Sequence, residues 1–182
     1  MAKTLKANLL NTKIINVIRK FMIFDDLSPE GIKKLLVKDA EYERPVVKLS
    51  KYDAGEIVIK QGEFDCWSFW VVTGEYEVIQ ESNVVAAFTK PGQIFGEMSV
   101  LEGIPRTATV VSKTGGVCLC LDMSIIENMA DDQIRETIKK GFNRVILARL
   151  NKAKGRMKRE KKRIEMKYAD VLNFENRIRG KA

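Results

Sequence analysis

The 182-residue chain contains no histidine, three cysteines and four prolines. The lack of histidine excludes catalytic triads with an imidazole base and most zinc centres, and three scattered cysteines are too few for a structural zinc site. Because Cys118 and Cys120 lie two apart in an apolar run, we expect reduced core thiols rather than a disulfide framework. No apolar run approaches the roughly 18 residues of a membrane span. These absences predict a soluble, cytoplasmic protein without a metal site.

Charge is distributed unevenly along the chain. The net charge is +8, yet the segment from Asp131 to Ala182 alone holds 17 basic and 7 acidic residues, a net charge of +10. The preceding residues hold 15 basic and 17 acidic residues, a net charge of −2. This distribution predicts one nearly neutral domain, large enough for a hydrophobic core, followed by a basic helical appendage.

Short runs of Val, Ile, Phe and Trp fill the region from Val46 to Leu121. Turn signals interrupt them every eight to twelve residues, a pattern typical of an antiparallel sandwich or barrel. We therefore predict an α+β protein built on an antiparallel β jelly-roll barrel with a mouth for a small ligand. Trp67 and Phe69 alternate onto one face of a strand, which favours core packing over a base-stacking surface. The turn signals are Asp53-Ala54-Gly55, Gln61-Gly62, Thr73-Gly74, Ser82-Asn83, Lys90-Pro91-Gly92 and Gly115-Gly116.

Helices are predicted on both sides of the barrel. Met1 to Phe24 has apolar residues near helical spacing and is predicted to pack on the domain, with an organelle presequence or an interfacial helix as alternatives. Ser28 is expected to cap, and Pro29 to open, a second helix that ends at about Ala40. After the barrel, Ser124 is expected to cap a short helix that ends at Met129. Asp131-Asp132 is then expected to open a long one.

The segment from Phe95 to Thr109 has the composition of an anion site. Gly96 offers an unhindered backbone amide, and the following residues can form a short helical turn with free N–H groups. Nine residues after Glu97 comes Arg106, whose fork of donors suits phosphate oxygens. A carboxylate close to a phosphate needs a neutral donor such as a sugar hydroxyl. Phosphate together with ribose indicates a nucleotide.

At these residues the sequence resembles the phosphate-binding cassette of the cyclic nucleotide-binding domain family. The matching positions are Phe95, Gly96, Glu97, Ser99, Val100, Leu101, Pro105, Arg106, Thr107, Ala108 and Thr109. The resemblance implies that Glu97 takes the ribose hydroxyl and Arg106 the cyclic phosphate. It also implies that backbone groups around the small residues complete the site. The ligand-binding set expected from it is Phe95, Gly96, Glu97, Met98, Ser99, Arg106, Thr107 and Ala108.

The chain departs from the family pattern in one hairpin. Asp65-Cys66 stands where the family usually has Gly-Asp, and Ser68 replaces an apolar residue. We expect these departures to change the turn geometry of the hairpin and to leave the phosphate site unaffected. In the family, a hydroxyl directly after the arginine is associated with cGMP sites. Thr107 therefore leans towards cGMP, but both cAMP and cGMP remain candidate ligands.

Two segments of the C-terminal region each have more than one interpretation. Ile134, Ile138 and Phe142 follow one helical face, which in the family folds over the base as a lid, or else only packs on the barrel or a partner. Gly141 within this pattern weakens the helix and suggests a hinge. Lys152 to Arg163 forms a dense basic run, read as a solvated helix, a nuclear-type signal, or a patch for a polyanion or anionic lipid. The residues after the lid helix are too few for the helix-turn-helix of DNA-binding relatives.

These features predict three parts and one main function. Residues 1–45 form N-terminal helices, 46–130 the nucleotide-binding β-roll, and 131–182 the lid helix with its basic tail. The expected function is a non-enzymatic sensor of cAMP or cGMP that regulates an unidentified protein partner. The alternative is a structural or nucleic-acid adaptor with a degenerate site and an active basic tail. Nucleotide hydrolysis is disfavoured because it needs metals and histidines.

Overall fold

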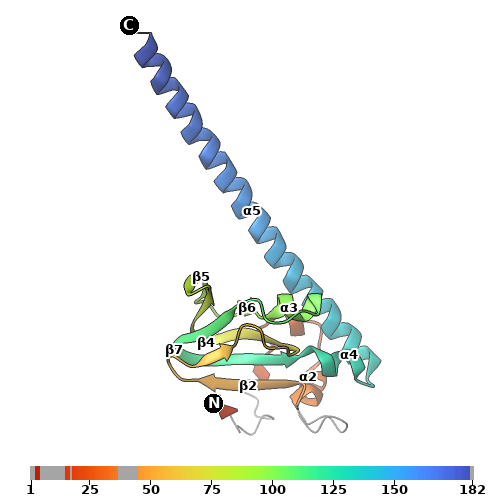
Figure 1. The fold of residues 1–182 in the computed structure, drawn as a ribbon. Helices are drawn as coiled ribbons and strands as arrows, with labels where there is room; N and C mark the ends of the chain where they lie inside the picture. Colours follow the sequence, from red (N-terminus) through yellow and green to blue (C-terminus); the bar gives the residue numbers. More distant parts are fainter. Residues whose placement is uncertain (1–2, 5–14, 17, 37–44, 181–182) are drawn as a thin grey trace. The chain divides into compact units, whose positions relative to one another are not determined.

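The structure is a computed structural model that describes residues 3–4, 15–16, 18–36 and 45–180. The chain divides into two units, which we call unit 1 (Met1–Gly141) and unit 2 (Phe142–Ala182). Unit 1 holds the sheet and the short helices, and unit 2 consists of the larger part of helix α5 (Asp132–Arg179; Figure 1). None of the helices in the described ranges combines the length and apolar character that a bilayer crossing requires.

The strands of unit 1 form one antiparallel sheet, in which β2, β4 and β7 run side by side (Figure 1). Its main path is β1-β2-β7-β4-β5, while β3 pairs with β7 and β6 pairs with β4. The predicted α+β class and antiparallel β-roll are confirmed, but among the described residues no pairing joins β1 to β5, so the sheet is not closed as a barrel would be. The strands are β1 (Lys3–Thr4), β2 (Val47–Tyr52), β3 (Ile57–Ile59), β4 (Trp67–Gln80), β5 (Asn83–Phe88), β6 (Ile94–Phe95) and β7 (Thr109–Asp122).

Strands β4 and β7 are each 14 residues long and pair along most of their length. Their glycines, predicted as turns, lie instead within the strands, where the pairing register shifts near Gly74. A Cβ atom on Gly74 would lie 2.3 Å from the carbonyl oxygen of Gly115, and one on Gly116 would lie 2.3 Å from that of Thr73. The glycines are therefore needed because two backbones approach closely where the long strands bend.

An aromatic cluster fills the core between the strands. Phe95 lies with its ring centroid 5.3 Å from Phe69, 5.4 Å from Tyr76 and 5.3 Å from Phe88. Phe69 is buried in this core and Trp67 packs against it partly buried, which confirms core packing for these two residues. The predicted reduced core thiols are also confirmed, since Cys118 and Cys120 are free and fully buried. Burial raises the pKa of both thiols and of the Tyr76 phenol above their ordinary values.

Of the three helix starts predicted from the sequence, two are confirmed and one is wrong. Helix α2 (Pro29–Leu36) begins after Ser28, whose Oγ accepts a hydrogen bond from the Gly31 amide at 3.1 Å. Helix α5 begins after Asp131, whose Oδ1 accepts from the Ile134 amide at 3.1 Å. The cap predicted for α4 (Met123–Asn128) is wrong, because Asp122 rather than Ser124 caps it and accepts from the Ser124 amide at 3.1 Å.

The prediction of a helix from Met1 to Phe24 fails at the first residues that the structure describes. Lys3–Thr4 forms strand β1, which pairs with Lys51 and Ser50 of β2, because the edge of β2 offers it backbone partners. The prediction holds further along, where residues 15, 16 and 18 are helical with Ile15 and Ile18 buried. A 3-10 turn, η1 (Met22–Phe24), follows with Ile23 and Phe24 buried. Residues 5–14 and 17 of the predicted first helix, and 37–40 of the second, lie outside the described residues.

The first turns of α5 pack on these N-terminal elements within unit 1. Ile134 and Ile138 are buried, and the Asp131 carboxylate receives a hydrogen bond from the Lys34 ammonium of α2 at 2.8 Å. A Cβ on Gly141 would lie 2.2 Å from the carbonyl oxygen of Ile23. The glycine predicted as a hinge is therefore required for close contact between α5 and η1.

Candidate functional site

The predicted anion site begins at the turn between β6 and α3 (Glu97–Glu102). Gly96 adopts the left-handed conformation with φ of 79° and forms the N-terminal boundary of α3. A Cβ at this position would lie 2.8 Å from Ile59 Cδ1, 3.0 Å from Arg106 Nη1 and 3.2 Å from Phe69 Cδ2. Both the backbone angle and the lack of space therefore require glycine. This close approach places the Arg106 guanidinium directly against the turn.

Arg106 is 3% exposed, and all five of its guanidinium hydrogens face protein acceptors. Nη1 donates to Ser99 Oγ at 3.0 Å and to the Gly96 carbonyl. Nε donates to Asp65 Oδ2 at 3.0 Å, and Nη2 donates to Asp65 Oδ1 and to the Trp67 carbonyl. The arginine thus forms a bidentate ion pair with Asp65 and links α3 to strand β4.

The backbone of the same residue ties the cassette to the β3–β4 loop. The Arg106 amide donates to the Glu63 carbonyl at 2.8 Å, and the Gly62 amide donates to the Arg106 carbonyl at 2.9 Å. The expectation that Asp65 would affect only its hairpin is wrong, because this pairing holds the hairpin beside the guanidinium. Asp65 is the site residue that the sequence analysis missed. It lies 41 positions from Arg106, and its departure from the family pattern was the only signal in the sequence.

The other predicted ligand-binding residues differ in accessibility. Glu97 and Ser99 are buried at 3% and 5% exposure, whereas Met98 is 54% exposed. Thr107 is exposed and Ala108 is half-buried. Phe95 belongs to the aromatic cluster and therefore contributes to the site through core packing. The structure therefore brings Gly96, Ser99 and Arg106 into direct contact and adds Asp65 to them.

The residues predicted as a lid are all buried. Ile134 packs against α2, where its Cδ1 lies 3.9 Å from the position of a Cβ on Gly31. Ile138 is fully buried in unit 1, and Phe142, the first residue of unit 2, is 2% exposed. Ile134 therefore packs on α2 within unit 1, and a role of these residues as a lid over the base stays a prediction.

The positive charge of the site is already paired with a carboxylate. Asp65 compensates the charge of Arg106, and its side chain remains 34% exposed. A phosphate that approached the guanidinium would offer it the same planar pair of oxygens that Asp65 provides. Among the described residues, no group of three or more His, Cys, Asp or Glu side chains could hold a metal ion. An anion would reach the guanidinium by replacing one of these protein acceptors.

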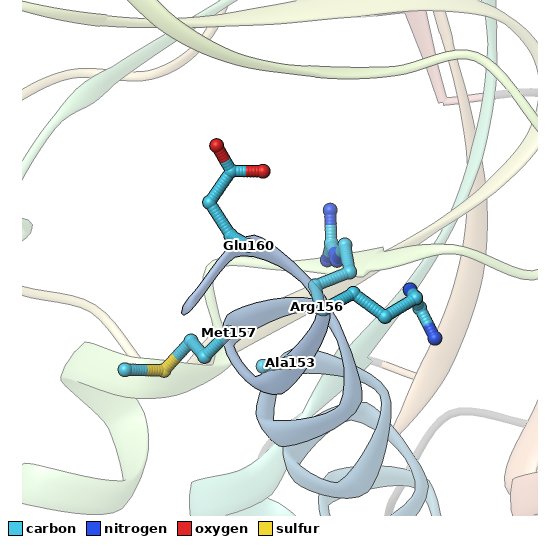
Figure 2. Close-up of a pocket in the computed structure, with 5 residues that line it drawn as sticks. Ala153, Arg156, Met157 and Glu160 are labelled. Carbon is cyan, nitrogen blue, oxygen red and sulfur yellow. The ribbon is translucent and has the colours of Figure 1, made fainter. Parts of the chain in front are cut away.

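A separate hollow on α5 does not enclose a ligand. It is lined by Ala153, Arg156, Met157, Arg159 and Glu160, which all belong to about two turns of one helix (Figure 2). A single helix surface cannot surround a small molecule, since such sites bury most of their ligand. The hollow is a feature of the helix surface.

Comparison with known proteins gives the following matches. Residues 49–133 match the family model of the cyclic nucleotide-binding domain. The chain is 29% identical over 111 residues to a cAMP-dependent protein kinase type II regulatory subunit of Drosophila melanogaster, covering 60% of this chain and 27% of that protein. It is 38% identical over 91 residues to a cGMP-dependent protein kinase of Eimeria tenella, covering 49% of this chain and 9% of that protein. The chain thus spans about a quarter or less of these relatives.

Two solved structures share the fold. A cyclic nucleotide-binding domain from Methylobacillus flagellatus superposes with a TM-score of 0.60 at 20% identity, covering 79% of this chain and 80% of that one. The regulatory subunit of a cAMP-independent protein kinase A from Trypanosoma brucei superposes with a TM-score of 0.54 at 19% identity, covering 72% of this chain and 44% of that one. At these identities the superpositions show the fold alone.

Proposed function

Since residues 49–133 make this chain a member of the cyclic nucleotide-binding domain family, we propose that it binds cAMP or cGMP in the segment from Phe95 to Thr109. The protein acts as a sensor that binds the nucleotide without converting it. The observation that carries this proposal is the buried guanidinium of Arg106, held against Gly96 and Ser99 by direct hydrogen bonds. A buried guanidinium beside a glycine turn is suited to a phosphate diester.

Binding requires the guanidinium to exchange partners. Because its five hydrogens already face protein acceptors, a cyclic phosphate gains direct contact only when Asp65 or the Gly96 carbonyl and Ser99 hydroxyl give way. Release of Asp65 removes the side-chain tie of the loop between β3 and β4, while its backbone stays hydrogen-bonded to Arg106. The hairpin is thus the first element that responds to the ligand. The binding part comprises residues 46–130, flanked by an N-terminal part, residues 1–45, and a C-terminal part, residues 131–182.

Isothermal titration calorimetry with cAMP and with cGMP tests the proposal. Arg106→Lys keeps the charge and removes the fork of donors, so we expect it to weaken binding roughly tenfold. Thr107→Ala, at an exposed position, is expected to lower cGMP affinity more than cAMP affinity. Recovery of the nucleotide unchanged after incubation checks that the protein is not an enzyme. Equal affinity of wild-type protein and Arg106→Lys would contradict the site assignment.

A second candidate function follows from the same ion pair. If Asp65 occupies the phosphate position permanently, the domain is a scaffold that binds no nucleotide and acts through its basic C-terminal helix. The fold permits this, since one structural neighbour is described as belonging to a cAMP-independent kinase. Absence of heat change with either nucleotide, together with no rise in thermal stability at millimolar ligand, would favour the scaffold.

A further inference from the structure

The part of α5 that lies in unit 2 exposes large apolar side chains at a regular spacing. Leu150, Met157, Ile164, Val171 and Ile178 follow one another at intervals of seven residues, and each is at least 46% exposed. Two turns of an α-helix take about seven residues, so these side chains form one line along the helix. A helix that is merely solvated has no reason to keep such a line apolar.

A second line runs beside the first. This second line consists of the residues four positions before each member of the first line. Together the two lines occupy the two core positions of a heptad repeat, and we call them the seam. Ten large apolar side chains are exposed from Leu147 to Ile178. Six of these ten lie on the seam, although the seam holds only two of every seven positions. The second line is Ile146, Ala153, Glu160, Lys167 and Phe174.

Figure 2 shows a short part of this seam. Met157 and Arg156 leave the helix on different sides, and the hollow around the small side chain of Ala153 is bordered by Met157 and Glu160 (Figure 2). A small residue between larger ones is the hole that a side chain of a facing helix enters in coiled-coil packing. The hollow that encloses no small molecule therefore suits a knob from another helix.

Basic residues flank the seam on both sides. Arg149, Arg156 and Arg163 each precede a member of the first line by one position, and Lys154 and Lys161 each follow one by four positions. These positions face the partner helix in a coiled coil and determine which partner is accepted. The helical part of unit 2, residues 142–179, has 13 basic and 4 acidic residues, a net charge of +9.

A second copy of this chain does not match these charges. In a parallel pair in register, Glu160 would oppose Glu160 and Lys167 would oppose Lys167 within the seam, and Arg156 would face Lys161 of the other copy. An antiparallel pair would still bring together two segments with a net charge of +9 each. Like charges across such an interface oppose association.

We propose that the seam docks an acidic amphipathic helix of another protein and forms a two-stranded coiled coil with it. The partner helix carries apolar residues at its two core positions and Glu or Asp at its flanking positions. The seam from Ile146 to Ile178 spans 33 residues, which is about 50 Å of helix. This proposal is independent of nucleotide binding, because all the residues that carry it lie in unit 2.

The test uses a synthetic acidic peptide of about 35 residues with Leu at both core positions and Glu at both flanking positions of each heptad. Its binding to the full chain is measured by fluorescence anisotropy in about 0.15 M and 0.5 M salt. Ile164→Lys should weaken binding roughly tenfold to a hundredfold, because it places a charge where an isoleucine would be buried. The matched control Met166→Lys adds the same charge at an exposed position off the seam and should change affinity less than about twofold.

Circular dichroism of both variants checks that helix content is retained, and a peptide with Lys in place of Glu at the flanking positions should not bind. Equal loss of affinity for Ile164→Lys and Met166→Lys would overturn the proposal. So would preferential binding of a duplex DNA oligonucleotide, which would assign the segment to polyanions. A dimer of the chain alone that Ile164→Lys dissociates would make the occupant a second copy and would also overturn it.

Discussion

In unit 1, Arg106 and Glu97 are each 3% exposed, whereas in unit 2 Met157 is 72% exposed and Ile164 is 60% exposed. One region buries charged side chains and the other leaves apolar side chains in solvent. Each reverses the ordinary distribution, in which charged residues are almost never fully buried and large apolar patches are covered. Both reversals occur at positions fixed by a motif, a binding cassette in one case and a heptad in the other. A local departure from the usual burial pattern therefore indicates where a partner is expected.

The largest expected effect comes from removing the buried cation. Arg106→Ala leaves Asp65 without its ion pair and removes five donors from the site, so it should lower the free energy of unfolding by about 3 kcal/mol. We take the lower end of the usual range because Asp65 is 34% exposed. The same variant should weaken nucleotide binding more than Arg106→Lys does. Urea unfolding measures the stability, and a loss under about 1 kcal/mol would show that the charge is not structurally important.

Two glycines of α5, one in each unit, differ in their surroundings. Gly141→Ala places a methyl group 2.2 Å from the carbonyl oxygen of Ile23 and should destabilise unit 1 by about 2 kcal/mol, even after the gain in helix propensity. In Gly155→Ala, the nearest atom to the new Cβ is the tip of Arg159 at 3.7 Å, so the propensity gain of up to about 1 kcal/mol should appear unopposed. Thermal unfolding of the two variants should shift in opposite directions. Shifts of the same sign would contradict the close packing at Gly141.

Alkaline pH should affect unit 1 through its buried thiols and phenols. Burial raises the pKa of Cys118, Cys120, Tyr52 and Tyr76, so the folded state keeps these protons while the unfolded state releases them above about pH 9. The unfolded state then binds fewer protons, and stability falls as pH rises. We expect a loss of about 1.4 kcal/mol or more for each of the two thiols between pH 8 and pH 10, measured by urea unfolding. Tyr52→Phe should reduce the total loss, and a flat profile over the same interval would contradict the burial of these groups.

The smallest expected effect concerns the competing carboxylate. Asp65→Asn keeps the shape of the side chain and removes its charge, so the guanidinium should accept a cyclic phosphate more readily. We expect nucleotide affinity to rise about three- to tenfold. The matched control Glu63→Gln removes the same charge from an exposed side chain of the same loop and should change affinity less than about twofold. A decrease for Asp65→Asn would mean that Asp65 orients the arginine rather than competing for it.

Most of the fold was predictable because it depends on local patterns. Alternation of apolar residues placed the strands of unit 1, and Ser28 and Asp131 cap helices as predicted. The prediction failed where a distant partner decides the structure. Lys3–Thr4 has helical surroundings in the sequence but pairs with the edge of β2. Gly74 and Gly116 resemble turn residues in the sequence, yet each is required by the backbone of the strand opposite.

The phosphate-binding cassette could be predicted from the sequence, but the ion pair between Arg106 and Asp65 could not. Gly96 and Arg106 stand at a spacing that the family shares, so a sequence identifies them. Asp65 comes from another strand connection, and only the pairing of the β3–β4 loop with Arg106 brings it to the guanidinium. The last helix shows the opposite case. Residues from Ile164 onwards continue α5 to Arg179, and their heptad spacing is readable from the sequence alone.

The pairing of β4 with β7 also affects the order in which the protein can acquire function. Partners in this ladder are separated by 30 residues at Ile79 and Thr109 and by 55 at Trp67 and Asp122. The cassette lies inside the loop that the ladder closes, so loop-closure entropy opposes its ordering until β7 has paired. During synthesis, Gly96 and Arg106 therefore leave the ribosome before the strand that holds them in place. Binding competence should appear only after Asp122 has emerged, whereas the helical contacts of α5 are local and can form on their own timescale.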